Sequence, residues 1–162
     1  MRLYLAGPLF TQAERLWNQT LAQGLRQAGH EVFLPQEAIA ELDRLEADPI
    51  FELDLNGVRA AEALVAVLDG ADPDSGTCFE CGVAHALGRP IVAVRTDFRA
   101  GGDALPGQTM PTVNLMLSQA VTEAIELVDP KIGPEAVLAA VLAALDRVAQ
   151  RSGNPRESPL VR

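Results

Sequence analysis

The sequence predicts an α/β fold: a doubly wound parallel sheet of five strands with helices on both faces. Short apolar runs alternate along the chain with longer stretches in which apolar residues recur at helical spacing. Such alternation produces parallel strands joined by right-handed crossovers. At 162 residues the chain can form one domain with its own core. We expect this domain over residues 1–151, and a disordered polar tail at residues 152–162.

The first half of the chain supplies three strands and three helices. Strands are expected at residues 3–6, 31–34 and 63–68, and helices at residues 11–28, 38–46 and about 49–61. Gly7 and Pro8 close the first strand, Gly29 ends the first helix, and Pro35 ends the second strand. The first helix carries apolar residues at helical spacing, namely Ala13, Leu16, Trp17, Leu21, Leu25 and Ala28.

The second half supplies the remaining elements. Helices are expected at residues 77–87, at residues 120–127 and from Pro134 onward, and strands at residues 90–95 and 112–117. Residues 96–111 contain several Gly and Pro residues and few apolar ones, which indicates a mobile loop. We expect this loop to act as a lid that excludes water from a site.

The charge of the chain argues against nucleic acid or a membrane as its partner. The formal net charge is −9, which repels a phosphate backbone and anionic lipid. No apolar run approaches the roughly 20 residues that span a bilayer. The sequence begins directly with a strand-like segment and leaves no room for a signal peptide, so we expect a cytoplasmic protein. No Gly-rich phosphate loop of the Walker or dinucleotide type is present.

Glu80 follows the third strand and its loop, at the edge of the sheet where parallel α/β folds bind ligands. We expect Glu80 in the first turn of the next helix, where the positive end of the helix dipole favours an ionised, nucleophilic carboxylate. Thr77 and Glu80 also match a capping box, in which Glu80 only starts the helix. Both interpretations remain open from this segment alone.

Three further polar residues are candidates for the same site. Tyr4 is the single tyrosine and lies in the first strand, where it could equally be a core aromatic. Asp54 lies at the edge of the buried face of its helix, where burial would raise its pKa and let it hold a proton. Asp74 lies in the loop before Glu80 and could be an ordinary turn residue. Crowded carboxyl groups separate into acid and base roles.

These residues occur in an order typical of a known family, because the chain resembles the nucleoside 2-deoxyribosyltransferases over about residues 1–127. The resemblance rests on four blocks: Tyr4 followed by Gly7 and Phe10; Asp54-Leu55-Asn56-Gly57; Asp74 six residues before Glu80, within Glu80-Cys81-Gly82-x-Ala84; and Asn114-Leu115-Met116.

The resemblance implies a flavodoxin-like sheet and a double displacement that needs no cofactor and no metal. Glu80 would attack C1′ of a 2′-deoxynucleoside and form a deoxyribosyl ester, which a second base or water would release. Asp54 would protonate the departing base and deprotonate the incoming one. Tyr4 would orient Glu80, and Asp74 would hold the 5′-hydroxyl group of the sugar.

The resemblance also implies further contacts and a homo-oligomer, either a dimer or a hexamer. Gly7, Phe10 and Gln36 would contact the nucleoside or free base, although Gly7 could also be a simple strand-ending turn. Asn114 and Met116 would complete the site of a neighbouring subunit. The chain differs from the family pattern at residues 37–48 and continues past the expected end with a further helix.

Two alternative functions remain open. A related branch hydrolyses nucleoside 5′-monophosphates with the same nucleophile. Asp74 would repel that phosphate, whereas Ser75 keeps this alternative open. The second alternative is a metal or redox site formed by Cys78, Cys81 and His85, whose spacing could place them on one helix face. Small buried thiols that fill gaps in the core explain the cysteines equally well.

Overall fold

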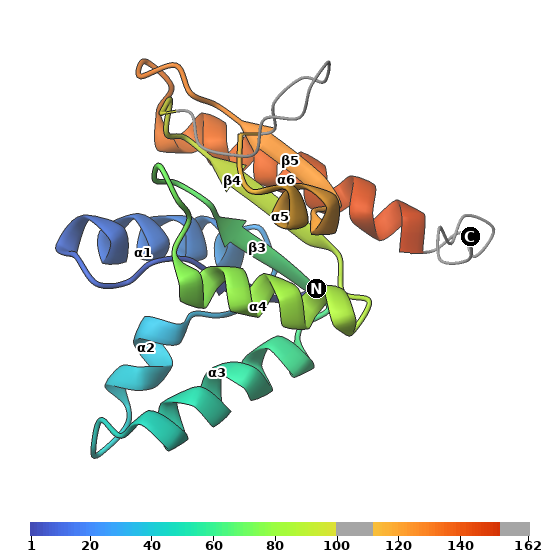
Figure 1. The fold of residues 1–162 in the computed structure, drawn as a ribbon. Helices are drawn as coiled ribbons and strands as arrows, with labels where there is room; N and C mark the ends of the chain where they lie inside the picture. The colour runs from blue at the N-terminus through green and yellow to red at the C-terminus, as the bar shows by residue number, and fades with distance from the viewer. Residues whose placement is uncertain (100–111, 153–162) are drawn as a thin grey trace.

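The computed structural model describes residues 1–99 and 112–152 and contains a five-stranded, all-parallel sheet (Figure 1). Its strands are β1 (Arg2–Ala6), β2 (Glu31–Phe33), β3 (Ala63–Val67), β4 (Ile91–Arg95) and β5 (Glu123–Glu126). They lie in the order β2-β1-β3-β4-β5, which is the flavodoxin-like order. The predicted fold class is therefore confirmed. Most of the predicted lid and tail lies outside the described residues.

Helices cover both faces of this sheet (Figure 1). The helices α1 (Gln12–Gln27) and α6 (Pro134–Ser152) pack on one face, and α3 (Ala47–Ala60), α4 (Ser75–Ala86) and α5 (Leu115–Ala120) pack on the other. A short helix, α2 (Pro35–Ala40), precedes α3. Successive strand residues alternate between the two cores, so that Leu3 and Leu5 face α1 and α6 whereas Tyr4 and Ala6 face α3 and α4. Every residue of β3 and β4 is buried, as expected for central strands covered on both faces.

The predicted strand at residues 112–117 and the predicted helix at residues 120–127 are both wrong. The chain forms α5 first and β5 second. The Asn114 side chain accepts a hydrogen bond from the Met116 backbone N–H at 2.9 Å and so begins a helix. β5 is an edge strand in which Ile125 alone is buried. Its few apolar residues fit a helix and a strand equally well in the sequence, and pairing with β4 decides between them.

The second helix also differs from the prediction, because α2 spans Pro35–Ala40 rather than residues 38–46. Pro35 does end β2, but it also occupies the first turn of α2, where its fixed φ favours a helix. Across the described ranges, 1–99 and 112–152, no helix is both long enough and apolar enough to cross a membrane.

Candidate active site

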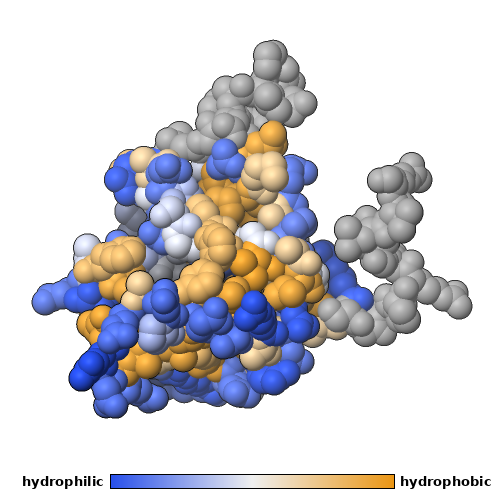
Figure 2. Space-filling model, turned by 60° about the horizontal axis from the view of Figure 1, so that its bottom comes forward, coloured by the Kyte–Doolittle hydropathy of each residue, from blue (hydrophilic) through white to orange (hydrophobic). Residues whose placement is uncertain are grey.

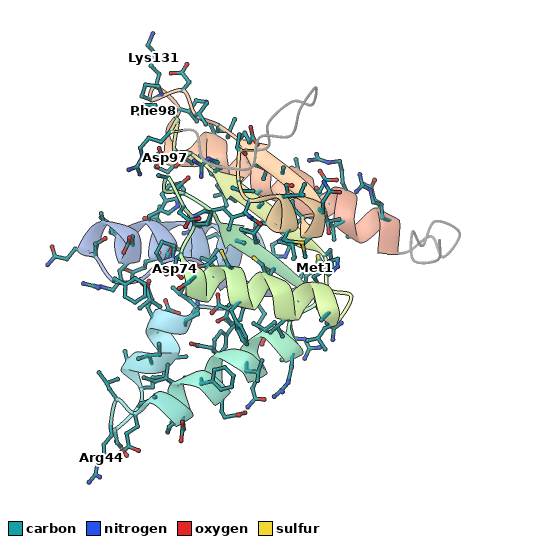
Figure 3. The ribbon with its side chains drawn as sticks, viewed as in Figure 1. Met1, Arg44, Asp74, Asp97, Phe98 and Lys131 are labelled. Carbon is teal, nitrogen blue, oxygen red and sulfur yellow. The ribbon has the colours of Figure 1, made fainter. Side chains whose placement is uncertain are left out.

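The candidate site lies where the strand order of the sheet reverses, between β1 and β3. The helix after β1 packs on one face of the sheet and the helix after β3 packs on the other, so the loops that follow these strands diverge and leave a crevice. Tyr4 comes from β1 and Glu80 from α4. Asp74 lies at the N-terminal end of α4 (Figure 3).

A short hydrogen bond joins Tyr4 and Glu80. The Tyr4 hydroxyl donates to Glu80 Oε1 at 2.5 Å. Tyr4 is completely buried. Burial is the main cause that raises the pKa of its hydroxyl, and the charge of the neighbouring Glu80 raises it further, so Tyr4 remains a protonated donor. Burial raises the pKa of Glu80 to about 7, with contributions from Asp54 and Asp74, while the Tyr4 hydrogen bond lowers it. Glu80 is therefore poised to exchange its proton near neutrality.

The expected place of Glu80 in the first turn of its helix is wrong, and so is the capping box. The structure starts α4 at Ser75 and caps it with Asp74, whose Oδ2 accepts hydrogen bonds from the Thr77 backbone N–H at 2.8 Å and from the Thr77 hydroxyl at 3.1 Å. Glu80 then lies in the second turn, beyond the free N–H groups of the helix start. Burial consequently decides its pKa, in the direction opposite to the dipole effect expected from the sequence.

Asp54 stands across from Glu80 on α3. Its Oδ1 is buried and has no hydrogen-bond partner among the described residues. Burial raises the pKa of this carboxyl group, as the sequence analysis expected. Because an ionised oxygen without a partner is costly to bury, the environment favours the protonated acid. Asp54 can therefore deliver a proton to a group bound beside it.

The two carboxyl groups line a cleft of about 140 Å³ between α3 and α4, hereafter the α3–α4 cleft. Its lining consists of Phe51, Asp54, Leu55, Val58, Gly76, Phe79, Glu80 and Val83. Apart from the two acids, these side chains are apolar. A mostly apolar cleft with a few convergent polar groups is typical of small-molecule sites.

Asp74 lies beside the α3–α4 cleft, whereas Gly7 faces Asn18 of α1 and Val67 of β3. Gly76 lines the α3–α4 cleft, and a Cβ atom on it would lie 3.1 Å from Asp74 Oδ2. The Asp74 carboxylate therefore lies at the end of the cleft where α4 begins. A Cβ atom on Gly7 would lie 3.2 Å from Val67 Cβ and 3.1 Å from Asn18 Oδ1. The absence of a side chain at Gly7 thus permits the close approach of the β1 and β3 ends.

Gln36 and Phe10 do not line the α3–α4 cleft. The Gln36 amide donates to the Arg15 carbonyl at 2.9 Å, and its oxygen accepts from the Asn18 amide at 3.4 Å. Gln36 is therefore fixed against α1. Phe10 is 72% exposed in the loop after β1. The structure places both residues after neighbouring strands, β1 and β2, at the carboxyl edge of the sheet.

Asn114 and Met116 lie on the other side of α4 from Glu80. They line a larger cleft of about 620 Å³ between α4 and α5, hereafter the α4–α5 cleft, together with Asp72, Ser75, Cys78 and His85. Met116 is 79% exposed. The structure therefore does not bring these two residues to Glu80 of the same chain.

The two thiols on α4 differ in exposure, because Cys78 is half-buried and Cys81 is fully buried. Burial raises the pKa of Cys78, and it raises the pKa of Cys81 to about 12. The Cys78 thiol donates to the Pro73 carbonyl at 3.7 Å. Metal-binding and redox-active cysteines have lowered pKa values instead. The portion of the chain that the structure describes holds no group of three His, Cys, Asp or Glu side chains placed for a metal ion.

Two residues that position Tyr4 were missed by the sequence analysis. Phe33 stacks on the Tyr4 ring with centroids 5.3 Å apart and planes inclined by 12°. Gly57 on α3 faces both rings, and a Cβ atom there would lie 2.9 Å from Tyr4 Cε2 and 2.8 Å from Phe33 Cε1. A glycine inside a predicted helix lowers its stability, and such a glycine often marks a place where another group packs closely against the helix. Gly57 in the predicted helix at about residues 49–61 was therefore the signal in the sequence for this contact.

The loop between β3 and α4 is fixed by a polar cluster. Asp69 accepts hydrogen bonds from the Thr96 backbone N–H at 2.5 Å, the Thr96 hydroxyl at 2.7 Å and the Asp97 backbone N–H at 3.0 Å. The buried Arg95 donates to the carbonyls of Leu68 at 2.5 Å and Gly70 at 3.0 Å. These bonds tie the ends of β3 and β4 together and hold the segment that leads to Asp74 and α4.

The fold and the site define a flavodoxin-like α/β protein with paired carboxyl groups at the point where the strand order reverses, the position at which this fold binds small molecules. The family model for nucleoside 2-deoxyribosyltransferase matches residues 3–119. The chain belongs to this family, whose members are enzymes.

Solved structures share the fold of this chain. A conserved protein from Enterococcus faecalis V583 is 31% identical, with 89% of this chain and 98% of that chain covered and a TM-score of 0.67. The 2-deoxyribosyltransferase from Bacillus psychrosaccharolyticus is 23% identical, with 87% and 96% covered and a TM-score of 0.63. The CMP N-glycosidase BcmB from Clostridium botulinum is 18% identical, with 88% and 99% covered and a TM-score of 0.58. The last two show a shared fold. No curated protein sequence matches the chain.

Proposed function

We propose that the protein is a cytoplasmic nucleoside 2-deoxyribosyltransferase that exchanges the base of 2′-deoxyribonucleosides through a covalent deoxyribosyl-glutamate intermediate. The observation that carries this proposal is the 2.5 Å hydrogen bond from Tyr4 to Glu80, in a cleft that Glu80 shares with Asp54. A nucleophilic carboxylate needs an oriented oxygen, and the Tyr4 hydroxyl fixes Oε1 while the second oxygen stays available for attack.

The first half-reaction breaks the bond between C1′ and the base nitrogen. The free oxygen of ionised Glu80 attacks C1′ and forms an ester, while the base nitrogen takes the proton of Asp54 and leaves. In the second half-reaction, the incoming base gives a proton to Asp54 and attacks C1′, and the ester bond to Glu80 breaks. The enzyme returns to its starting protonation state, and no cofactor takes part.

The reactive form of the enzyme carries one proton on the pair of carboxyl groups. Glu80 must be ionised to attack, and Asp54 must be protonated to expel the base. Burial raises the pKa of both groups, and the neighbouring Asp54 raises that of Glu80 further, so they titrate as a coupled pair. The rate should therefore be highest where the pair holds one proton, and should fall both at lower pH, where Glu80 is protonated, and at higher pH, where Asp54 is ionised.

Asn114 and Met116 would complete the site of a neighbouring subunit in a dimer or hexamer. Their place across α4 from Glu80, with Met116 exposed, supports this role. Mixing two inactive variants tests it: a Glu80→Gln subunit supplies Asn114, and an Asn114→Asp subunit, which keeps the helix cap, supplies Glu80. Restored base exchange after mixing is the expected result. No restoration in a mixture shown to exchange subunits would contradict the shared site.

An N-glycoside hydrolase is the second candidate, because water could release the same ester. The likeness to a CMP N-glycosidase supports it. The resemblance places Asp74 at the 5′ end of the sugar, where its carboxylate would repel a phosphate, so a nucleoside 5′-monophosphate is the less favourable substrate. The experiment that separates the candidates compares a deoxynucleoside with its 5′-monophosphate, each with and without a second free base. A swapped nucleoside supports transfer; free base alone, released at the same rate with or without an acceptor, would contradict it.

A further inference from the structure

Two phenylalanines flank the carboxyl groups of the α3–α4 cleft. Phe51 lies one turn before Asp54 on α3, and Phe79 immediately precedes Glu80 on α4. Their rings meet across the cleft with centroids 6.1 Å apart and planes inclined by 50°. Figure 2 brings the α3 side of the molecule toward the viewer and shows apolar surface among the polar side chains there. Phe51 is 50% exposed and Phe79 is 55% exposed, so each ring keeps a free surface.

The position of this pair fits the flat, apolar faces of a nucleobase. The base must lie beside Asp54 to exchange a proton with it, and Phe51 is the aromatic residue nearest to Asp54 on the same helix face. A base held between two rings needs them about 7 Å apart, because each stacking contact takes about 3.5 Å. At 6.1 Å the rings leave no such space between them. A base would therefore stack on their exposed faces.

We propose that Phe51 and Phe79 form the surface on which the departing and the incoming nucleobase stack, and that they thereby favour transfer over hydrolysis. This inference rests on the proposed function. A base that stays stacked beside the deoxyribosyl ester is the nearest acceptor and occupies space that water would otherwise enter. Since every base has a π-face, the surface accepts purines and pyrimidines alike, with the larger purines held more tightly.

Direct binding of free bases tests the surface without any need for turnover. Adenine and thymine are titrated by calorimetry into the wild-type protein, into the variant that combines Phe51→Leu with Phe79→Leu, and into the variant that combines Phe51→Tyr with Phe79→Tyr. Leucine keeps the apolar character and removes the ring, so adenine affinity should fall roughly tenfold. Tyrosine keeps the ring and should lose far less. Leu16→Ala is the control, because Leu16 is a 65% exposed apolar residue on α1, which packs on the opposite face of the sheet.

Steady-state kinetics with a deoxynucleoside and a different acceptor base give the second readout. In the leucine variant the KM for the acceptor should rise severalfold, and the ratio of hydrolysis to transfer should rise with it. Unchanged base affinity in the leucine variants would overturn the inference. A change in sedimentation without loss of base affinity would assign the pair to a subunit contact and overturn it as well. If the double variant does not fold, the single variants give the same comparison.

The two proposals fail in different ways. A wild-type protein that neither exchanges nor releases bases would contradict the proposed function, while calorimetry would still decide whether the phenylalanines bind a base. An active enzyme whose acceptor KM and product ratio ignore both phenylalanines would contradict the inference alone.

Discussion

The two sides of helix α4 carry different chemistry although they belong to one rigid element. The side facing α3 presents Glu80 to a buried tyrosine and to a second acid, in a cleft of about 140 Å³. The side facing α5 presents Cys78 and His85 to a cleft of about 620 Å³. The difference lies in what each side faces. Glu80 packs toward the sheet and a second carboxyl group, which moves its pKa toward neutrality.

The comparison teaches that residue type alone does not identify the reactive side. A sequence that contains two cysteines and a histidine at helical spacing invites a metal or redox interpretation. The thiols nevertheless hold their protons, because burial raises their pKa values without a cation nearby to lower them. On the carboxyl side, burial that hydrogen bonds compensate only in part raises the pKa values of Glu80 and Asp54, and the proposed reactivity rests on this. Variants at both sides test this contrast, and three of the tests have a control on the opposite side of α4 or in the substrate.

Replacing Glu80 by Gln should have the largest effect. The amide keeps the shape of the side chain but cannot form the ester, so base release and base exchange should fall at least about a thousandfold. The measurement is release of free base from a deoxynucleoside. His85→Gln on the α5 side should leave the rate within about twofold. Equal losses in both variants would contradict the assignment of chemistry to the α3 side.

The same Glu80→Gln variant should be more stable than the wild type at pH 8. The pKa of Glu80 is raised from 4.5 to about 7 in the fold, so the native state binds the proton more tightly than the unfolded state. Wild-type stability therefore declines as the pH rises from about 4.5 to about 7. Glutamine removes the buried charge and should add about 1–3 kcal/mol at pH 8, measured by urea unfolding. A loss of stability would point to a structural role for the carboxylate.

Replacing Asp54 by Asn should lower the rate with natural nucleosides about 10²- to 10³-fold, because the departing base loses its proton donor. The control lies in the substrate: a deoxyribosyl compound with an acidic leaving group, such as p-nitrophenol, needs no proton. The variant should cleave that compound at nearly the wild-type rate. An equal loss with both substrates would show that Asp54 acts on binding or folding.

Replacing Tyr4 by Phe should reduce the rate near neutrality about tenfold, the value of a hydrogen bond to a charged group. The Tyr4 hydroxyl lowers the pKa of Glu80, so its removal raises that pKa further. The acidic limb of the pH–rate profile should consequently move to higher pH. The profile of kcat/KM measures this shift, and a limb that stays in place or moves to lower pH would exclude the proposed action of Tyr4.

Gly57→Ala should have the smallest effect on chemistry and act through packing. The added methyl group would lie 2.9 Å from the Tyr4 ring and 2.8 Å from the Phe33 ring, so one of them must move. We expect a loss of about 1–3 kcal/mol of stability, together with reduced activity. Gly82→Ala is the control on the α5 side, where no atom lies within 4 Å of the new Cβ. It should stabilise the helix by up to about 1 kcal/mol.

The parallel sheet could be predicted because the central strands are uniformly apolar and separated by helical periodicity, whereas its flavodoxin-like order was implied only by the resemblance to the family. Residues 63–67 and 91–95 are buried without interruption, as expected for central strands covered on both faces. The region after residue 111 could not be predicted in the same way. α5 and β5 are short elements at the edge of the sheet, and their few apolar residues fit either periodicity.

The grouping of Tyr4, Asp54 and Glu80 was predictable, but the electrostatics of Glu80 were not. Tyr4 drew attention as the single tyrosine, placed in the first strand, and Asp54 by its edge position on α3. The cap of α4 was misplaced because Asp74, Ser75 and Thr77 are all good cap residues, and the structure selects Asp74. That shift of one turn removes Glu80 from the helix dipole and reverses the expected direction of its pKa shift. Contacts across the fold, such as Gly57 against the Tyr4 ring, have no counterpart in local sequence.

Peptide mass spectrometry of a trapped reaction tests the central claim most directly. The wild-type protein is mixed with a 2′-deoxynucleoside, quenched in acid within one turnover and digested with protease. The account predicts a mass increase of one deoxyribosyl group on the peptide that contains Glu80, absent from the Glu80→Gln variant. An adduct on Cys78 or His85, or base exchange that proceeds with no covalent adduct at any time, would contradict it.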